Sequence, residues 1–154
     1  MTGDYNFGYH FNIVEQVAFG SFMARALKSE GINWALNAGK HFYDYREKEW
    51  YIKTTDAGGI AIIDAISDPE KITVYPESNY RGTSFRLGAG SYDLTDLQAV
   101  GFTTAGSIMV PIDYKVTLYS EDEFQGSSLV LEKTMQNNDG FQVKSMIIVF
   151  ESLV

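Results

Sequence analysis

Two stretches in the second half of the chain match each other: VYPESNYRG at residues 74–82 and LYSEDEFQG at residues 118–126. Each has an aromatic residue, four other residues, a second aromatic, one further residue and then glycine. The distance between the copies, from Gly82 to Gly126, is 44 residues. A repeat at this period indicates that one supersecondary unit has been duplicated within the chain.

This pattern has a physical interpretation. The first aromatic residue lies on a strand, the chain folds over in a hairpin, and the second aromatic residue returns to stack near the first. The glycine then supplies a positive φ or a close backbone approach. Each unit ends in an apolar strand that begins with serine, either Ser107 or Ser145. We expect these hydroxyl groups to hydrogen-bond the backbone of the folded hairpin.

Together these features resemble the βγ-crystallin motif, which members of that family use twice per domain. In the first unit, LGAGSYDL at residues 87–94 resembles the tyrosine corner of the family, with Tyr92 as the corner residue. The second unit departs from the family pattern, because residues 132–138 form a polar stretch in place of the corner. The resemblance covers about half the chain, from about Lys71 to Val149, and implies a Greek-key β-sandwich. The residues that it makes structural are Tyr75, Tyr80, Gly82, Tyr92, Ser107, Tyr119, Phe124, Gly126 and Ser145.

Many microbial members of this family bind two calcium ions through loops of the pattern (Asn/Asp)-(Asn/Asp)-x-x-(Ser/Thr)-Ser. The pattern suits calcium, which takes several hard oxygen ligands at once. Aligned on the final serine, the loops here are residues 102–107 and 140–145. The first lacks the acidic pair and has Gly106 at the hydroxyl position, and the second has Lys144 there. Two alternatives remain open: a metal-free domain, or a calcium site that uses nearby acidic residues. The calcium candidates are Glu77, Glu121 and Asp139.

The first part of the chain predicts a small α+β unit. Asn12 and Glu15 have the spacing of a capping box, and apolar residues then recur at helical spacing up to Leu27. Gly31 follows as a helix-ending residue, so we expect an amphipathic helix over about 12–30.

A β-hairpin is expected over about 49–66, after this helix. The residues around Trp50 favour a strand, DAGG at residues 56–59 favours a turn, and residues 60–66 are read as the second strand. The predicted fold class is mainly β with an N-terminal α+β extension. The predicted domains are 1–68, the α+β unit, and 69–154, the βγ-crystallin-like sandwich.

The composition excludes several classes of function. The formal net charge of −8 disfavours nucleic acid and anionic membranes as partners. The absence of cysteine excludes disulfides, zinc–thiolate sites and cysteine nucleophiles. No apolar run approaches the roughly 18–20 residues of a membrane-spanning helix, so no membrane insertion is expected. Residues 1–5 have neither the basic nor the apolar region of a signal peptide.

Three classes of function follow, and an enzyme is the least favoured. His10 and His41 lie among aromatic residues, and Asp44 and Glu49 have basic neighbours, so these groups fit packing and a charged turn better than catalysis. We expect a non-enzymatic structural or assembly protein, part of a larger particle or coat such as a virion or an extracellular layer, with a protein partner or self-assembly. The alternative is a module that binds calcium, carbohydrate or a protein, with protease inhibition included.

Overall fold

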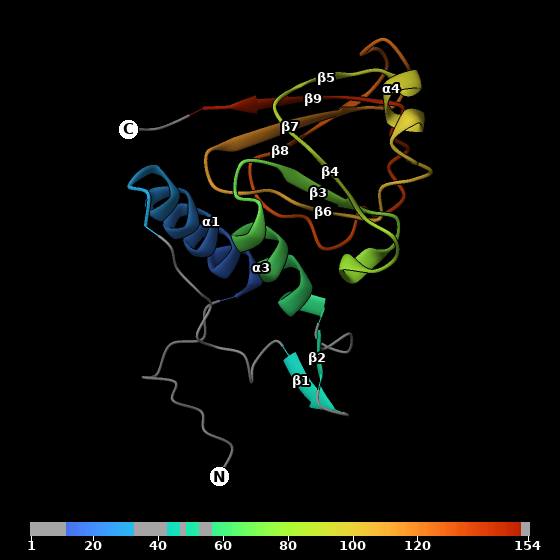
Figure 1. Cartoon of the computed structure of the whole chain (residues 1–154). Helices are drawn as coiled ribbons and strands as arrows, with labels where there is room; N and C mark the ends of the chain where they lie inside the picture. The colour runs from blue at the N-terminus through green and yellow to red at the C-terminus, as the bar shows by residue number, and fades with distance from the viewer. Residues whose placement is uncertain (1–11, 33–42, 47–48, 53–56, 152–154) are drawn as a thin grey trace.

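The computed structural model describes residues 12–32, 43–46, 49–52 and 57–151. Figure 1 shows a β domain made of two sheets, with the helices α1 (Ile13–Ser29) and α3 (Ala57–Ser67) packed together beside it. The fold class is as predicted, mainly β with an N-terminal α+β extension.

The first sheet has three antiparallel strands in the order β4-β3-β6. They are β3 (Ile72–Tyr75), β4 (Phe85–Leu87) and β6 (Ser107–Met109). A 3₁₀ turn, η1 (Ser78–Tyr80), lies between β3 and β4 in the chain.

The second sheet has four antiparallel strands in the order β5-β9-β7-β8. These strands are β5 (Gly90–Tyr92), β7 (Tyr114–Tyr119), β8 (Ser128–Leu131) and β9 (Ser145–Phe150). A short helix, α4 (Leu94–Ala99), follows β5 and starts from a capping box made by Asp93 and Asp96.

The two repeats interlock because each contributes backbone to the sheet of the other. Strand β5 belongs to the first repeat but pairs with β9 of the second, with Ser91 opposite Ile147. In return, Met135 of the second repeat forms a bridge with Ile108 of β6. This exchange makes the two repeats one Greek-key sandwich, as the resemblance implied.

Apolar side chains from both sheets form the main core. Strand β7 alternates between buried and half-buried residues, and its inward residues Val116 and Leu118 lie across from Ile148 and Met146 of β9. This period-two burial is the pattern of a strand with one covered face.

Helix α1 begins and ends where the sequence predicts. The side chain of Asn12 accepts from the backbone N–H of Glu15, and the side chain of Glu15 accepts from the N–H of Asn12, so the capping box is complete. Gly31 has φ +66°, the conformation that ends a helix most readily at glycine.

The prediction of a hairpin over 49–66 is wrong. The hairpin consists of β1 (Tyr43–Arg46) and β2 (Glu49–Ile52), and residues 60–66 belong to helix α3. A short, almost continuous apolar run has no periodicity that separates a strand from a buried helix. Here Ala61 and Ala65, one helical turn apart, are both fully buried.

A second, smaller core attaches the helices to the first sheet. Helix α1 packs on α3, and α3 packs against β3, β6 and η1. Gly20 of α1 is where the helices approach closely, because a Cβ there would lie 3.0 Å from Cγ1 of Ile66. The buried members of this core are Val17, Ala61, Ile62, Ala65, Tyr75, Tyr80 and Met109. The division of the chain at residue 68 stays a prediction.

Candidate functional site

The first folded hairpin is closed by a serine. Tyr75 and Tyr80 make an edge-to-face contact with ring centroids 5.5 Å apart at 73°. The Ser107 hydroxyl accepts from the N–H of Tyr80 at 2.9 Å and donates to the carbonyl of Glu77 at 2.6 Å. Asn79 and Tyr80 both have φ of 59°, so the hairpin holds two residues in the left-handed region.

The second hairpin repeats this geometry. Tyr119 and Phe124 lie 5.9 Å apart at 75°. The Ser145 hydroxyl accepts from the N–H of Phe124 at 3.0 Å and donates to the carbonyl of Glu121 at 2.7 Å. Phe124, like Tyr80, has a positive φ, of 61°. The duplication found in the sequence is therefore a duplication of contacts.

Each hairpin needs its glycine. Gly82 has φ +87°, and a Cβ there would lie 3.1 Å from Cδ of Pro76 and closer still to its Cγ. Gly126 has φ +78°, and a Cβ there would lie 2.9 Å from Cγ of Glu121. A side chain at either position would combine backbone strain with a clash.

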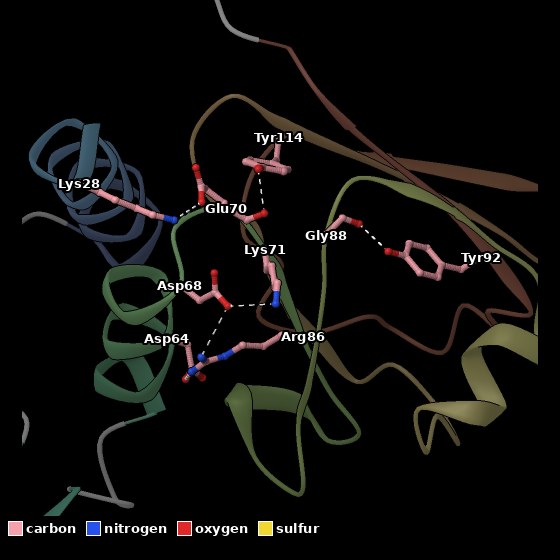
Figure 2. Close-up of polar contacts among 9 residues, drawn as sticks. All are labelled: Lys28, Asp64, Asp68, Glu70, Lys71, Arg86, Gly88, Tyr92 and Tyr114. Atoms are coloured by element: carbon pink, nitrogen blue, oxygen red, sulfur yellow. Dashed lines mark hydrogen bonds and ion pairs between the residues drawn. The ribbon is translucent and has the colours of Figure 1, made fainter. Parts of the chain in front are cut away.

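The corner stretches of the two repeats differ. The Tyr92 hydroxyl donates to the carbonyl of Gly88 at 2.9 Å, which ties the turn between β4 and β5 (Figure 2). In the second repeat, the buried amide of Asn138 donates to the carbonyls of Ala105 at 2.7 Å and Phe141 at 2.6 Å. Asn138 thus joins the two loops that the calcium pattern would use, and no spacing in the sequence predicted this.

The first of these loops lies directly against its hairpin. The N–H of Gly106 donates to the carbonyl of Tyr75 at 2.8 Å, and its own carbonyl accepts from the N–H of Asn138 at 2.9 Å. A Cβ at Gly106 would lie 2.6 Å from Cα of Glu77 and 2.7 Å from its carbonyl oxygen. A hydroxyl ligand therefore has no room at the position where the calcium pattern places one.

Asp122, an acidic residue near Lys144 of the second loop, is engaged in other contacts. The Asp122 carboxylate accepts from the N–H of Leu94 at 2.9 Å and from that of Glu123 at 2.8 Å. These bonds lower the pKa of Asp122, the one from Leu94 most, and the charge of Lys144 acts in the same direction. Lys144 thus places a positive charge in a loop where calcium would need an oxygen.

The calcium candidates do not form a cluster. The side chains of Glu77, Glu121 and Asp139 are exposed. Among the residues that the structure describes, no group of three or more acidic or histidine side chains is placed to hold a metal ion. The donor sets of the two loops do not fit a calcium ion, and the calcium assignment of these three residues stays a prediction.

A polar network fixes α3 to the first sheet (Figure 2). The Tyr75 hydroxyl donates to the Asp64 carboxylate, which also pairs with Arg86 at 2.8 Å. Burial raises the pKa of Tyr75, and the Asp64 charge raises it further. Arg86 also lies 3.9 Å from the carboxylate of Asp68, and Lys71 lies 3.6 Å from it. The sequence prediction placed Asp64 on a strand and therefore did not indicate this network.

The end of α1 is attached to the sandwich by two further sets of contacts. Lys28 forms an ion pair with Glu70, whose carbonyl accepts from the Tyr114 hydroxyl at 2.8 Å (Figure 2). Arg25 donates to the Asp113 carboxylate at 2.7 Å and to the carbonyl of Ile112 at 2.9 Å.

The residues considered for catalysis are only partly described. His10 and His41 lie outside the described residues. Asp44 lies on β1 and Glu49 on β2, but their side chains also lie outside the description. Within the described residues, none of the helices combines the length and apolar character needed to cross a bilayer.

Comparison with solved structures supports the resemblance of the sandwich to the βγ-crystallin family. A βγ-crystallin domain from Flavobacterium johnsoniae is 28% identical, with a TM-score of 0.52, and the match covers 54% of this chain and 98% of that domain. About half of this chain forms a βγ-crystallin domain. The N-terminal domain of protein S is similar as well, at 25% identity and a TM-score of 0.50, over 52% of this chain and 96% of that one. No family model matches the βγ-crystallin domain or the rest of the chain, and no curated protein sequence does so significantly.

Proposed function

We propose that this chain is a non-enzymatic structural or assembly protein, a component of a larger particle or coat. In this proposal the βγ-crystallin domain is the scaffold and the helix pair provides the contact surface. The observation that supports it is the outward face of α1. Phe19, Phe22 and Met23 are 68%, 47% and 38% exposed there.

These three residues form one stripe, because positions three and four apart lie on the same side of a helix. The opposite side of α1 already packs inside the molecule, through Val17 and Ala24. The stripe is thus a second apolar face that the fold of the described residues does not use. A cluster of large exposed apolar side chains marks a contact surface, whereas scattered ones do not.

The scaffold works without calcium in this proposal. Gly106 packs against the backbone of Glu77, and Lys144 places a positive charge in the other loop. The hydroxyl groups of Ser107 and Ser145 already hold both hairpins closed. The similarity to βγ-crystallin domains, rather than to enzymes, supports the non-enzymatic assignment.

Sedimentation velocity over a range of protein concentrations tests the assembly role. We expect the mass of the wild-type protein to rise with concentration above the 17.3 kDa of one chain. The variant Phe19→Gln, Phe22→Gln, Met23→Gln should stay at that mass, because glutamine keeps the helix but removes the apolar stripe. The control is Val100→Gln, an exposed apolar residue at the end of α4. A wild-type protein that stays monomeric at every concentration contradicts the proposal.

A thermal melt tests the metal-free scaffold. Calcium that bound only the native state at a hundredfold excess over Kd would stabilise it by about 2.7 kcal/mol. We expect the same melting temperature in EGTA and in millimolar calcium, with magnesium as the control. A rise of several degrees with calcium alone would show that the chain is a calcium-binding module instead.

A further inference from the structure

The duplication gives the outer face of the first sheet an equivalent in the second sheet. On β3, Thr73 lies opposite Met109 of β6 and Arg86 of β4. On β7, Thr117 lies opposite Ile147 of β9 and Val130 of β8 in the same way. The equivalent pairs are Thr73 and Thr117, Tyr75 and Tyr119, Tyr80 and Phe124, Arg86 and Val130, and Met109 and Ile147.

Among the described residues, helices cover the first face and leave the second uncovered. Tyr75, Tyr80 and Met109 of the first face are at most 1% exposed, because they belong to the core that α1 and α3 complete. Their equivalents Tyr119, Phe124 and Ile147 are only partly buried. The helix pair lies on the side of the first sheet in Figure 1.

The second face, made of the outward residues of β7, β8 and β9 together with Phe124, is mainly apolar. Val130 is 50% exposed and Val149 is 38% exposed. Its outward strand rows contain one charged residue, Lys115, which lies 3.6 Å from Glu151. Its remaining outward residues are Thr117, Tyr119, Ser128 and Ile147. Ser145 lies in the same row but is fully buried under the second hairpin.

We propose that a second copy of this chain covers this face with the outward stripe of its α1. The inference rests on the proposed assembly role and names its partner and both contact surfaces. The chain itself supplies the precedent, since an apolar helix, α3, covers the equivalent face of the first sheet. The stripe of Phe19, Phe22 and Met23 is a helix face of the same kind.

The charges favour this pairing over two α1 helices packed on each other. Glu15 and Glu30 flank the stripe at its two ends, and both are exposed. An antiparallel pair of α1 helices would place Glu15 of one copy near Glu30 of the other, and like charges repel. Against the second face, the same glutamates meet strands that contain no acidic residue.

The contact joins two different surfaces, so it is head-to-tail. The stripe belongs to the helix pair on the first repeat, and the face belongs to the second repeat, so one copy can use both at once. Heterologous contacts of this kind build rings when the rotation closes and open chains when it does not. Both outcomes fit a component of a larger particle.

Two complementary variants test the inference by sedimentation velocity. The stripe variant is Phe19→Gln, Phe22→Gln, Met23→Gln, and the face variant is Val130→Glu, Val149→Glu. All five positions are exposed, so both variants keep the core, and circular dichroism checks their fold. Gln98→Glu, Val100→Glu, which adds two negative charges at exposed positions of α4 and its end, is the charge-matched control for the face variant.

We expect the wild-type protein and the control to assemble as concentration rises, and each variant alone to stay at the mass of one chain. An equimolar mixture of the two variants should form 1:1 complexes and nothing larger, because it retains one intact contact per pair. A face variant that assembles as well as the wild type overturns the inference and leaves the assembly role standing. A monomeric wild-type protein overturns both.

Discussion

Replacing Ser107 with alanine removes the hydroxyl that closes the first hairpin. That hydroxyl makes two hydrogen bonds, one from the N–H of Tyr80 and one to the carbonyl of Glu77. Ser107 is fully buried, and Tyr80 is covered by the helix pair. Water cannot easily replace the lost partner, so the N–H of Tyr80 is left unsatisfied in the variant.

A buried donor or acceptor without a partner costs about 1–3 kcal/mol. We therefore expect Ser107→Ala to lower the free energy of unfolding by about 2–4 kcal/mol. The matched control is Ser145→Ala, which removes the same two bonds in the second hairpin. Ser145 is itself fully buried, but Phe124 is only partly buried where Tyr80 is fully buried. Water can therefore hydrate the freed N–H of Phe124, and the expected loss is about 0.5–1.5 kcal/mol.

Urea unfolding followed by far-UV circular dichroism measures both losses. The slope of free energy against urea should stay unchanged, because the surface exposed on unfolding is the same. The reasoning is refuted if Ser145→Ala destabilises the protein as much as Ser107→Ala does. An equal loss would mean that the helix pair adds nothing to the exclusion of water at the first hairpin, since both serines are fully buried.

Three further changes test other contacts. Burial raises the pKa of Tyr80 to about 12, so the native state holds this proton more tightly than the unfolded chain. The free energy of unfolding therefore keeps its full value below about pH 10 and falls as the pH rises toward 12. Tyr80→Phe should remove roughly 1.4 kcal/mol of that fall at pH 11. Urea unfolding at pH 8 and pH 11 measures the fall for both proteins, and an equal fall in the wild type and the variant would show that the pKa of Tyr80 is ordinary. Gly106→Ser should lower the free energy of unfolding by about 1–3 kcal/mol, because the new side chain clashes with the Glu77 backbone. Calcium should not raise the melting temperature of this variant. A rise with calcium would mean that the loop adapts to the metal. Arg25→Met keeps an apolar stem but loses the hydrogen bonds to Asp113 and to the carbonyl of Ile112. Hydrogen exchange in α1 should therefore accelerate, and the free energy of unfolding should fall by about 1.5–3 kcal/mol. Unchanged exchange would show that the apolar contacts alone hold the helix.

The parts of the fold that were predictable depend on short stretches of sequence. The helix that starts at Asn12 carries its own capping signal, and its observed limits agree with it. The two hairpins were found because an aromatic pair and a glycine at fixed spacing determine a local conformation. Residues 60–66 were misread because a run with a single polar residue, Asp64, contains no period. Their helical state is selected by burial between α1 and the first sheet.

The site depends on contacts between distant residues. The sequence pattern alone shows that Gly106 offers no side-chain ligand for calcium. Its backbone lies close to Glu77 because strand β6 packs against the first hairpin, which the sequence pattern does not indicate. Asn138, Arg25 and the Asp64–Tyr75 contact had no recognisable spacing, because their partners are brought near only when the sheets and helices pack.

The sequence alone was enough to establish that the chain contains two equivalent Greek-key units, since aromatic spacing, glycine and serine are local requirements of each unit. It could not distinguish their two outer faces, whose residues follow the same pattern. The tertiary structure decides which face is covered: α3 ends at Ser67, the short connector of residues 68–71 leads into β3, and α3 therefore packs on the first sheet. The face around Tyr119 and Phe124 lacks this helix pair, because burial depends on chain connectivity that a repeat pattern does not contain.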